Sequence, residues 1–445
     1  MQMRHRGSEI LNVASSRPDS AGRLPKTADV VVIGGGVAGV ATAMFLAQRG
    51  VSVVLCEKGR IAGEQSSRNW GWIRKMGRDH RELPLMIESA RLWEQLAAEI
   101  SEDIGYRKCG ATYLARSSAE LKRHVDWLEQ NAHFGLDSTL LTENETDRFL
   151  GRNDQRFLGA LHTASDAVAE PGLAVPALAR HAEAQGVRIV ENCAVRTVDV
   201  SAGRVSGVVT ELGRIDSANV VLAGGVWSRG FLENIGIAFP QLAIKSSVLR
   251  TSPATLSSTG AIGSDRVSIR PRRDGGYTVA RSGAAEFQLV PAAFRYFSQY
   301  LPILRERWQI MKIRAGRQFF GALGSARWDA DQISPFERVR VLDPTPDKVL
   351  LADVMKCAQD LFPQLSGVAP VESWAGMIDV VPDEIPAIGP VAGHEGLMVV
   401  TGLSGHGFGI GPGVGLLAAQ MVTGEAPIID PAVFSPARFN SKAAT

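Results

Sequence analysis

The chain has 445 residues, which is enough for two or three domain-sized units with a substantial core. Apolar residues make up 45% of the chain and charged residues 21%, and the net charge is +2. Because Lys and Arg are dispersed, this balance gives no electrostatic basis for binding nucleic acid. The four cysteines, Cys56, Cys109, Cys193 and Cys357, show no metal-like spacing among themselves or with histidine. We therefore expect reduced thiols and no metal site.

The two ends of the chain contain no obvious targeting or membrane segment. Residues 1–26 are polar and lack an apolar core, which predicts a flexible arm and not a secretory signal. Residues 396–424 contain no Asp, Glu, Lys or Arg, so they form the one candidate membrane span. Seven glycines between residues 402 and 415, together with Pro412, disfavour an isolated helix in a bilayer. We expect no transmembrane segment.

Residues 28–57, ADVVVIGGGVAGVATAMFLAQRGVSVVLCE, predict a strand, a tight turn, a helix and a second strand. Gly34, Gly36 and Gly39 have the G-x-G-x-x-G spacing of a dinucleotide-binding turn, and Glu57 ends the second strand. The glycines allow close approach to a pyrophosphate at the helix N-terminus, and Glu57 would accept hydrogen bonds from ribose hydroxyls. This acidic residue argues against a 2′-phosphate. Val37, Ala38 and Lys58 complete the predicted nucleotide contacts.

Four segments together resemble the D-amino-acid oxidase superfamily of flavoproteins, which includes glycine oxidase, sarcosine oxidase and D-amino-acid dehydrogenases. These segments are the strand–turn–helix unit at 28–57, GEQSSRNWGW at 63–72, the region from 186 to NVVLAGGVWS at 219–228, and SWAGMIDVVPDEIPAIG…TGLSGHGFGIGPGVG at 373–415. The resemblance implies that FAD is the cofactor.

The resemblance also assigns residues to the flavin site. It implies that Ser66 and Ser67 bond phosphate or ring atoms and that Arg68 and Asn69 brace their loop. Val195 would pack on adenine, and the turn at Ala223 would approach the pyrophosphate. The remaining cofactor residues implied are Trp70, Gly71, Gly224, Trp227, Gly376, Gly402, Gly405, His406, Gly407, Phe408 and Gly409. The positions used for covalent attachment in some relatives correspond to Arg68 and the vicinity of Gly376, so we expect non-covalent FAD.

The uncharged run at 396–424 fits the same interpretation. We expect a strand at 398–400, a glycine turn at 402–411 and a helix at 413–422. The helix N-terminus would face the flavin pyrimidine edge and stabilise the negative charge that reduction places there. His406 would add to this stabilisation.

The expected fold is α/β, with a glutathione-reductase-like Rossmann domain that binds FAD and an α+β substrate domain built on an antiparallel sheet. The segment 319–340 is interpreted as a loop or lid over the site. The expected division is an N-terminal arm (1–26), a discontinuous FAD-binding domain (27–75, 165–235 and 345–430), a substrate domain (76–164 and 236–344) and a C-terminal tail (431–445).

The resemblance implies oxidation of the C–N bond of an amine or amino acid, a D-amino acid or an N-substituted amino acid, by hydride transfer to flavin N5. The resulting imine hydrolyses. Many relatives bind the substrate carboxylate with an Arg after W-x-G-x, but Ile378 stands there. The cations that could replace it are Arg74, Arg250, Arg270, Arg314 and Arg317. We assign the catalytic face to Trp72, His406, Arg270 and Arg74, with Trp72 over the flavin.

Two alternatives stay open. One is a 2-hydroxy-acid oxidoreductase that uses His406 or His80 as a base, and the other is a flavin subunit of a larger dehydrogenase complex. The electron acceptor is O2 or a quinone or other electron-transfer partner. We expect a cytoplasmic protein, peripheral to the inner membrane if it is a dehydrogenase. The oligomeric state and the stereochemistry of the substrate are left open by the sequence.

Overall fold

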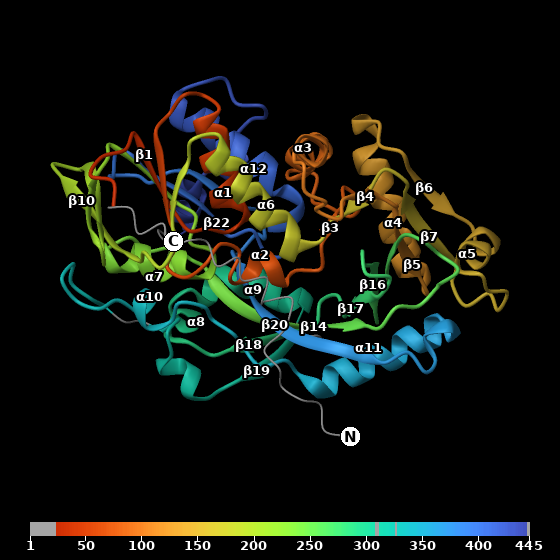
Figure 1. The fold of residues 1–445 in the computed structure, drawn as a ribbon. Coiled ribbons are helices and arrows are strands. Elements are labelled where there is room, and N and C mark those ends of the chain that lie inside the picture. The colour runs from red at the N-terminus through yellow and green to blue at the C-terminus, as the bar shows by residue number, and fades with distance from the viewer. Residues whose placement is uncertain (1–23, 308–310, 325–326, 443–445) are drawn as a thin grey trace.

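The computed structural model describes residues 24–307, 311–324 and 327–442. Two large sheets organise these residues, and they meet near the centre of the molecule (Figure 1). The expected N-terminal arm lies outside the described residues as far as residue 23. No described helix combines the length and the apolar character that crossing a membrane would need.

The first sheet has six strands. Their order is β21 (Ala387–Pro390), β22 (Leu397–Thr401), β13 (Asn219–Leu222), β1 (Val30–Ile33), β2 (Val53–Cys56) and β9 (Arg188–Val190). All neighbours are parallel except β21 and β22. Every residue of β1 and β2 is buried, as a continuous apolar run predicts for a sheet covered on both faces.

Helices cover one face of the first sheet, and a small antiparallel sheet covers the other. The helices are α1 (Val37–Ala47), α3 (Leu83–Glu99), α6 (Pro171–Ala184) and α12 (Gly407–Thr423). The small sheet is formed by β10 (Val195–Ser201), β11 (Arg204–Thr210) and β12 (Gly213–Asp216). Alternate residues of β1 enter the two resulting hydrophobic clusters, since Val30 and Val32 face the helices and Val31 and Ile33 face the small sheet.

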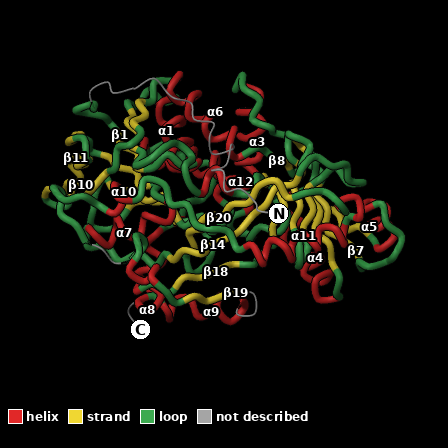
Figure 2. Tube along the Cα trace, turned by 60° about the horizontal axis from the view of Figure 1, so that its bottom comes forward, coloured by secondary structure: helices red, strands yellow, loops and turns green. Residues whose placement is uncertain are grey.

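The second sheet has ten strands. Their order is β19 (Met311–Arg314), β18 (Ala285–Gln288), β14 (Leu242–Thr251), β17 (Tyr277–Ala280), β16 (Ser268–Pro271), β15 (Ala261–Gly263), β5 (Ala111–Ala115), β7 (Gly159–Thr163) and β6 (Ser138–Leu141), with β20 (Pro370–Val380) also paired to β14. Figure 2 shows β20, β14, β18 and β19 side by side.

Shorter elements complete the described fold. Around the second sheet lie α4 (Ser118–Asn131), α5 (Glu143–Leu150), α8 (Pro291–Arg295), α9 (Phe297–Arg307) and α11 (Lys348–Leu361). A third small sheet is built from β3 (Trp72–Ile73), β8 (Ala167–Val168) and β4 (Arg107–Lys108). The remaining helices are α2 (Gln65–Arg68), α7 (Ser228–Asn234) and α10 (Pro335–Arg338), in addition to several 3₁₀ turns.

Four segments lie elsewhere than the expected division places them. β20 and α11 fall within 345–430, yet β20 pairs with β14 along almost its full length and α11 packs on the second sheet. Conversely, α3 packs against α12 in the core of the first sheet. In the expected lid, Trp328 and Phe336 are buried beside β10 and α7. Phe336 also lines the large cavity of the molecule, and Phe319 at the start of the segment contacts Phe294 of α8. The segment therefore packs mainly around β10 and α7, and its role as a lid stays a prediction.

The C-terminal helix also begins earlier than predicted. The sequence predicts a glycine turn as far as residue 411, but α12 starts at Gly407. A side-chain Cβ added at Gly415 would lie 2.5 Å from the Cβ of Ala41 in α1, and one added at Gly411 would lie 2.4 Å from Val37. The glycines therefore permit close packing of α12 against α1. This tertiary contact outweighs their low helix propensity.

Candidate active site

A cavity of about 780 Å³ extends from the end of β1 to the face of β14 and β20. One end is lined by the first glycine turn, the loop at 62–71 and the turn after β13. The other end is lined by β14, β18, β20 and helices α8 and α9. A single space thus joins the predicted nucleotide-binding turn to the second sheet.

The first glycine turn is shaped by close backbone approach. Gly34 has φ +110°, and a Cβ there would lie 2.5 Å from the carbonyl oxygen of Ala223. A Cβ at Gly39 would lie 2.0 Å from the carbonyl oxygen of Gly34, so Gly39 lets α1 pack on the turn but does not itself line the cavity. Gly36, Val37 and Ala38 at the N-terminus of α1 line the cavity, where the helix dipole favours an anion.

Glu57 is fixed by two backbone hydrogen bonds. Its carboxylate accepts from Gly35 N–H at 2.7 Å and from Gly59 N–H at 2.7 Å, and it lines the cavity. Burial raises the pKa of Glu57, although both hydrogen bonds and Lys58 act in the opposite direction. A carboxylate has about four lone-pair sites, so Glu57 retains acceptor capacity for hydroxyl groups.

The loop around α2 is tied to its surroundings through polar contacts. Ser66 Oγ accepts from Val37 N–H at 2.8 Å, which joins the loop to the start of α1. Asn69 accepts from Gly71 N–H and donates to Ser66 O. The buried Arg68 donates to Leu342 O at 2.7 Å and to Ala375 O. Arg68 and Asn69 therefore brace this loop in the structure.

Asp379 anchors the loop between β22 and α12, residues 402–406, which we call the closing loop. Its Oδ2 accepts from Gly402 N–H at 2.7 Å and from Leu403 N–H at 3.3 Å, and its Oδ1 accepts from Gln65 Nε2 at 2.8 Å. Burial raises the pKa of Asp379, against these hydrogen bonds. Asp379 thus connects the closing loop to the loop of α2, a role that the sequence analysis did not identify.

His406 is paired with a buried carboxylate. Its Nδ1 lies 2.9 Å from an Oε of Glu82, and Glu82 is fully buried at the start of α3. Burial and Arg78 lower the pKa of His406, so the imidazole is neutral near pH 7. Burial acts to raise the pKa of Glu82, but His406 and Arg78 outweigh it and hold that pKa below its usual range.

Aromatic side chains and a cation form the wall beyond α2. Trp72 is buried and contacts Trp70 and Tyr113 edge to face, with ring centroids 6.5 and 5.9 Å apart. The guanidinium of Arg74 lies 5.1 Å from the ring centroid of Tyr113 and 5.9 Å from that of Trp72. Trp72, Tyr113 and Arg74 all line the cavity, so this wall combines apolar surface with positive charge.

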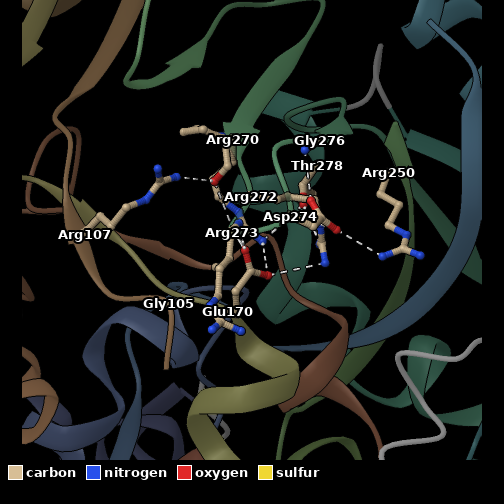
Figure 3. A network of polar contacts seen from close by, with 12 residues as sticks. Gly105, Arg107, Glu170, Arg250, Arg270, Arg272, Arg273, Asp274, Gly276 and Thr278 are labelled. Carbon is tan, nitrogen blue, oxygen red and sulfur yellow. Dashed lines mark hydrogen bonds and ion pairs between the residues drawn. The ribbon is translucent and has the colours of Figure 1, made fainter. Parts of the chain in front are cut away.

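Arg270 lies outside the lining of this cavity. It is buried and forms an ion pair with Glu170 at 2.6 Å, within the network of Arg272, Arg273 and Asp274 shown in Figure 3. It also donates to Trp70 O at 2.7 Å. Since its donors are occupied by groups of the protein, Arg270 has none left for a substrate carboxylate.

The other cations considered as replacements for the missing arginine are also engaged or distant. Arg250 pairs with Asp274 and Glu372, and Arg314 is exposed beside Glu286. The side chain of Arg317 lies outside the described residues. Neither Arg250 nor Arg314 lines the cavity.

Most of the predicted site residues meet at the cavity. Those that line it are Gly34, Gly36, Val37, Ala38, Glu57, Lys58, Ser66, Arg68, Asn69, Trp70, Gly71, Trp72, Arg74, Val195, Ala223, Gly224, Trp227, Gly376, Gly405, His406, Gly407, Phe408 and Gly409. Four predicted site residues do not line the cavity, namely Gly39, Ser67, Arg270 and Gly402. The sequence analysis missed Gln65, Arg78, Glu82, Arg281 and Asp379, because no local spacing marks them.

Comparisons with known proteins identify the family. A model of FAD dependent oxidoreductases, DAO, matches residues 29–421. L-Amino acid deaminase from Proteus myxofaciens, solved in complex with anthranilate, has 32% identity and a TM-score of 0.89, and the match covers 94% of this chain and 95% of that one. L-Amino acid deaminase from Proteus vulgaris matches at 30% identity with a TM-score of 0.88, over 94% and 98% of the two chains. Glycine oxidase from Pseudomonas putida is 28% identical over 92% of this chain and 98% of its own.

The chain therefore belongs to the DAO family of FAD-dependent oxidoreductases. The family match confirms the predicted α/β fold, the FAD cofactor and the prediction of an enzyme. The predicted oxidation of amino acids or amines is the chemistry for which these relatives are named.

The residues present fit FAD. The glycine turn leaves no room for a Cβ at Gly34, the N-terminus of α1 faces the cavity, and the Glu57 carboxylate stands at the end of β2. Gly34, Gly36, Glu57 and Ser66 would hold the dinucleotide at this end. Non-covalent attachment stays a prediction.

Proposed function

We propose that the chain oxidises the C–N bond of α-amino acids that carry a large apolar side chain. FAD, when bound, accepts the two electrons and the hydrogen removed from Cα. The observation that carries this proposal is the continuity of the cavity, which joins the flavin-binding turn to an apolar wall and to Arg74. The protein would therefore orient the substrate and exclude water from it.

The wall formed by the second sheet is apolar where relatives place an arginine. Ile378 of β20 pairs with Ile244 of β14, and both line the cavity together with Val248 and Phe287. Phe297 of α9 extends the same lining. Such a surface stabilises a bound apolar side chain by removing it from water, at about 25 cal/mol per Å². Glycine and other small substrates would leave this wall uncovered.

The aromatic wall supports a substrate that carries a carboxylate. Arg74 lines the cavity beside Trp72 and Tyr113, and a buried carboxylate requires a cation or hydrogen-bond donors. Ile378 cannot supply this charge. The Proteus myxofaciens relative was solved with anthranilate, which combines an aromatic ring with a carboxylate. The substrate proposed for this chain likewise combines an apolar group with a carboxylate.

The alternative of 2-hydroxy-acid oxidation has one supporting observation, the pair of His406 with Glu82 at 2.9 Å. A carboxylate that orients an imidazole is the arrangement expected of a general base. A hydroxy acid requires such a base to remove its hydroxyl proton, whereas a neutral amine does not.

A substrate panel tests the proposal. The purified enzyme is assayed with phenylalanine and leucine in both configurations, with glycine and sarcosine, and with the hydroxy acids and decarboxylated amines of the same side chains. Oxygen and a soluble quinone serve as acceptors in parallel. We expect the apolar amino acids to give the highest kcat/KM. Turnover of the hydroxy acids alone, or a preference for glycine, would contradict the proposal.

A further inference from the structure

Arg78 is a buried cation that the described residues leave largely unpartnered. Its side chain is 4% exposed and lines the cavity. Its guanidinium donates through Nε to Arg74 O at 3.2 Å, and Nη1 has no hydrogen-bond partner among the described residues. Guanidinium groups carry five donors, and a buried ion whose donors are unused is unfavourable in the absence of a ligand.

Two carboxylates act electrostatically on Arg78, and the hydrogen bonds that each accepts or shares are with other groups. Glu82 contacts His406 through one oxygen, while its other oxygen is buried without a partner. Asp166 accepts hydrogen bonds from the backbone N–H groups of Lys75 and Met76. Both carboxylates act electrostatically on Arg78, but no ion pair is formed with either one among the described residues.

The surroundings of Arg78 favour an anionic ligand. Burial and the neighbouring Arg74 lower the pKa of Arg78 to about 10, so the group is still charged at neutral pH. Arg74 and Arg78 are four residues apart and both line the cavity. A ligand carboxylate placed there would meet two cations beside Glu82, whereas a ligand without an acceptor would leave Nη1 of Arg78 without a hydrogen bond.

We propose that Arg78 is a substrate-binding residue that pairs with the substrate carboxylate, and that it selects α-amino acids over simple amines at this site. This inference rests on the proposed amino-acid oxidation. It assigns to Arg78 the anion-binding task that Ile378 cannot perform, and it places that task on the segment after β3, not on the second sheet.

The pairing is tested by ligand binding to the FAD-loaded enzyme, without turnover. Anthranilate and its uncharged analogue anthranilamide are titrated, and the change in the visible flavin spectrum gives each Kd. The variants are Arg78→Gln and Arg78→Lys. The control is Arg81→Gln, which removes the same charge from a side chain that is 38% exposed and paired with Asp79. FAD content and the melting temperature show whether each variant is folded.

In Arg78→Gln we expect the Kd of anthranilate to rise about 10-fold or more, since a charge-assisted pair is lost, while the Kd of anthranilamide changes by less than about twofold. The Kd of anthranilate for Arg78→Lys should lie between the values for Arg78→Gln and the wild type. If Arg78→Gln does not retain FAD, the Kd values of Arg78→Lys for the two ligands provide the test. Arg81→Gln should bind both ligands as the wild type does.

Three results would overturn the inference. One is unchanged anthranilate binding in the Arg78 variants, and a second is equal weakening of both ligands. The third is a loss of carboxylate selectivity in Arg281→Gln, another cavity-lining arginine, while the Arg78 variants retain it. If Arg78 governs anthranilate binding but the wild type oxidises no amino acid, the proposed function fails and the carboxylate site stands. If amino acids are oxidised and Arg78 has no effect on binding, only the inference fails.

Discussion

The carboxylate of Asp379 accepts a hydrogen bond from the backbone N–H of Gly402 at 2.7 Å, and this contact fixes the closing loop against β20. Asp379→Asn would replace one acceptor oxygen with an amino group that faces other donors. Because Asp379 is buried and Gly402 is buried with it, we expect FAD affinity to fall about 10-fold or more. Titration of the apoprotein with FAD measures this. The exposed Asp126→Asn on α4 is the control, and equal FAD affinity in the two variants would refute the role of Asp379.

The contact of α1 with α12 predicts a large effect of a single methyl group. In Gly415→Ala the new Cβ would lie 2.5 Å from the Cβ of Ala41 and 2.6 Å from the carbonyl carbon of Ala41. Relieving this overlap requires a shift of the helix backbone. We expect a loss of about 3 kcal/mol in the free energy of unfolding.

Gly230→Ala is the matched control, because Gly230 lies in α7 and a Cβ there meets nothing within 4 Å. That variant should gain up to about 1 kcal/mol. Urea unfolding of the two variants and the wild type checks both values. Equal stability of the two alanine variants would show that α12 does not pack on α1 as described.

Arg74 provides a prediction about substrate preference. If its guanidinium also faces the substrate carboxylate, Arg74→Gln should raise KM for an apolar amino acid about 10-fold. The decarboxylated amine of the same side chain should be affected much less. Steady-state kinetics with the two substrates give the comparison, and the exposed Arg123→Gln is the control. An equal rise in KM for both substrates would mean that Arg74 only supports the packing of the aromatic wall.

The raised pKa of Asp166 should make the free energy of unfolding depend on pH. It holds the segment that carries Arg74 and Arg78, and burial raises its pKa from 3.8 to about 6. Between these two pH values the folded protein binds a proton that the unfolded chain has released. The raised pKa of Asp166 therefore contributes about 3 kcal/mol to the free energy of unfolding below about pH 4. This contribution is lost as the pH rises through 6.

Asp166→Asn should abolish this part of the pH dependence. Urea unfolding between about pH 4 and pH 7 compares the variant with the wild type, and the difference between their free energies of unfolding should shift in favour of the variant as the pH rises. The exposed Asp126→Asn should follow the wild type. A constant difference between Asp166→Asn and the wild type would exclude a raised pKa at Asp166.

The flavin-binding half of the site could be predicted because its signals are local. The spacing of Gly34, Gly36 and Gly39, a buried strand before them and Glu57 at the end of the next strand describe one contiguous unit. Gly34 and Gly39 are required by close backbone approach, to Ala223 and to Gly34 respectively, whereas a Cβ at Gly36 would meet the Ser66 side chain at 3.1 Å. Such short-range geometry is encoded in the order of the residues themselves.

The substrate half could not be predicted in the same way. The sequence offers Arg270 as a replacement cation, but its partner Glu170 is 100 positions away and occupies its guanidinium. Likewise, His406 and Glu82 are separated by 324 positions. Which charges are paired and which face a cavity depends on packing between distant segments, and a single sequence contains no local signal for it.

The helix at the end of the chain shows the same limit in secondary structure. The sequence predicts that this helix starts at Gly413, because glycine has a low helix propensity, yet α12 begins at Gly407 and includes Gly409 and Gly411. A Cβ at Gly413 would lie 2.9 Å from the carbonyl oxygen of Leu85 in α3. These glycines are selected by contact with α1 and α3, which becomes visible only in the folded protein.

The most direct test of the central claim is anaerobic mixing of the FAD-loaded enzyme with an apolar amino acid while the visible flavin absorbance is followed. The matching 2-hydroxy acid and the decarboxylated amine are mixed in parallel. We expect one enantiomer of the amino acid to bleach the flavin fully, the amine to do so much more slowly, and the hydroxy acid to leave it oxidised. A flavin that stays oxidised with every amino acid, or is bleached by the hydroxy acid alone, would contradict the central claim.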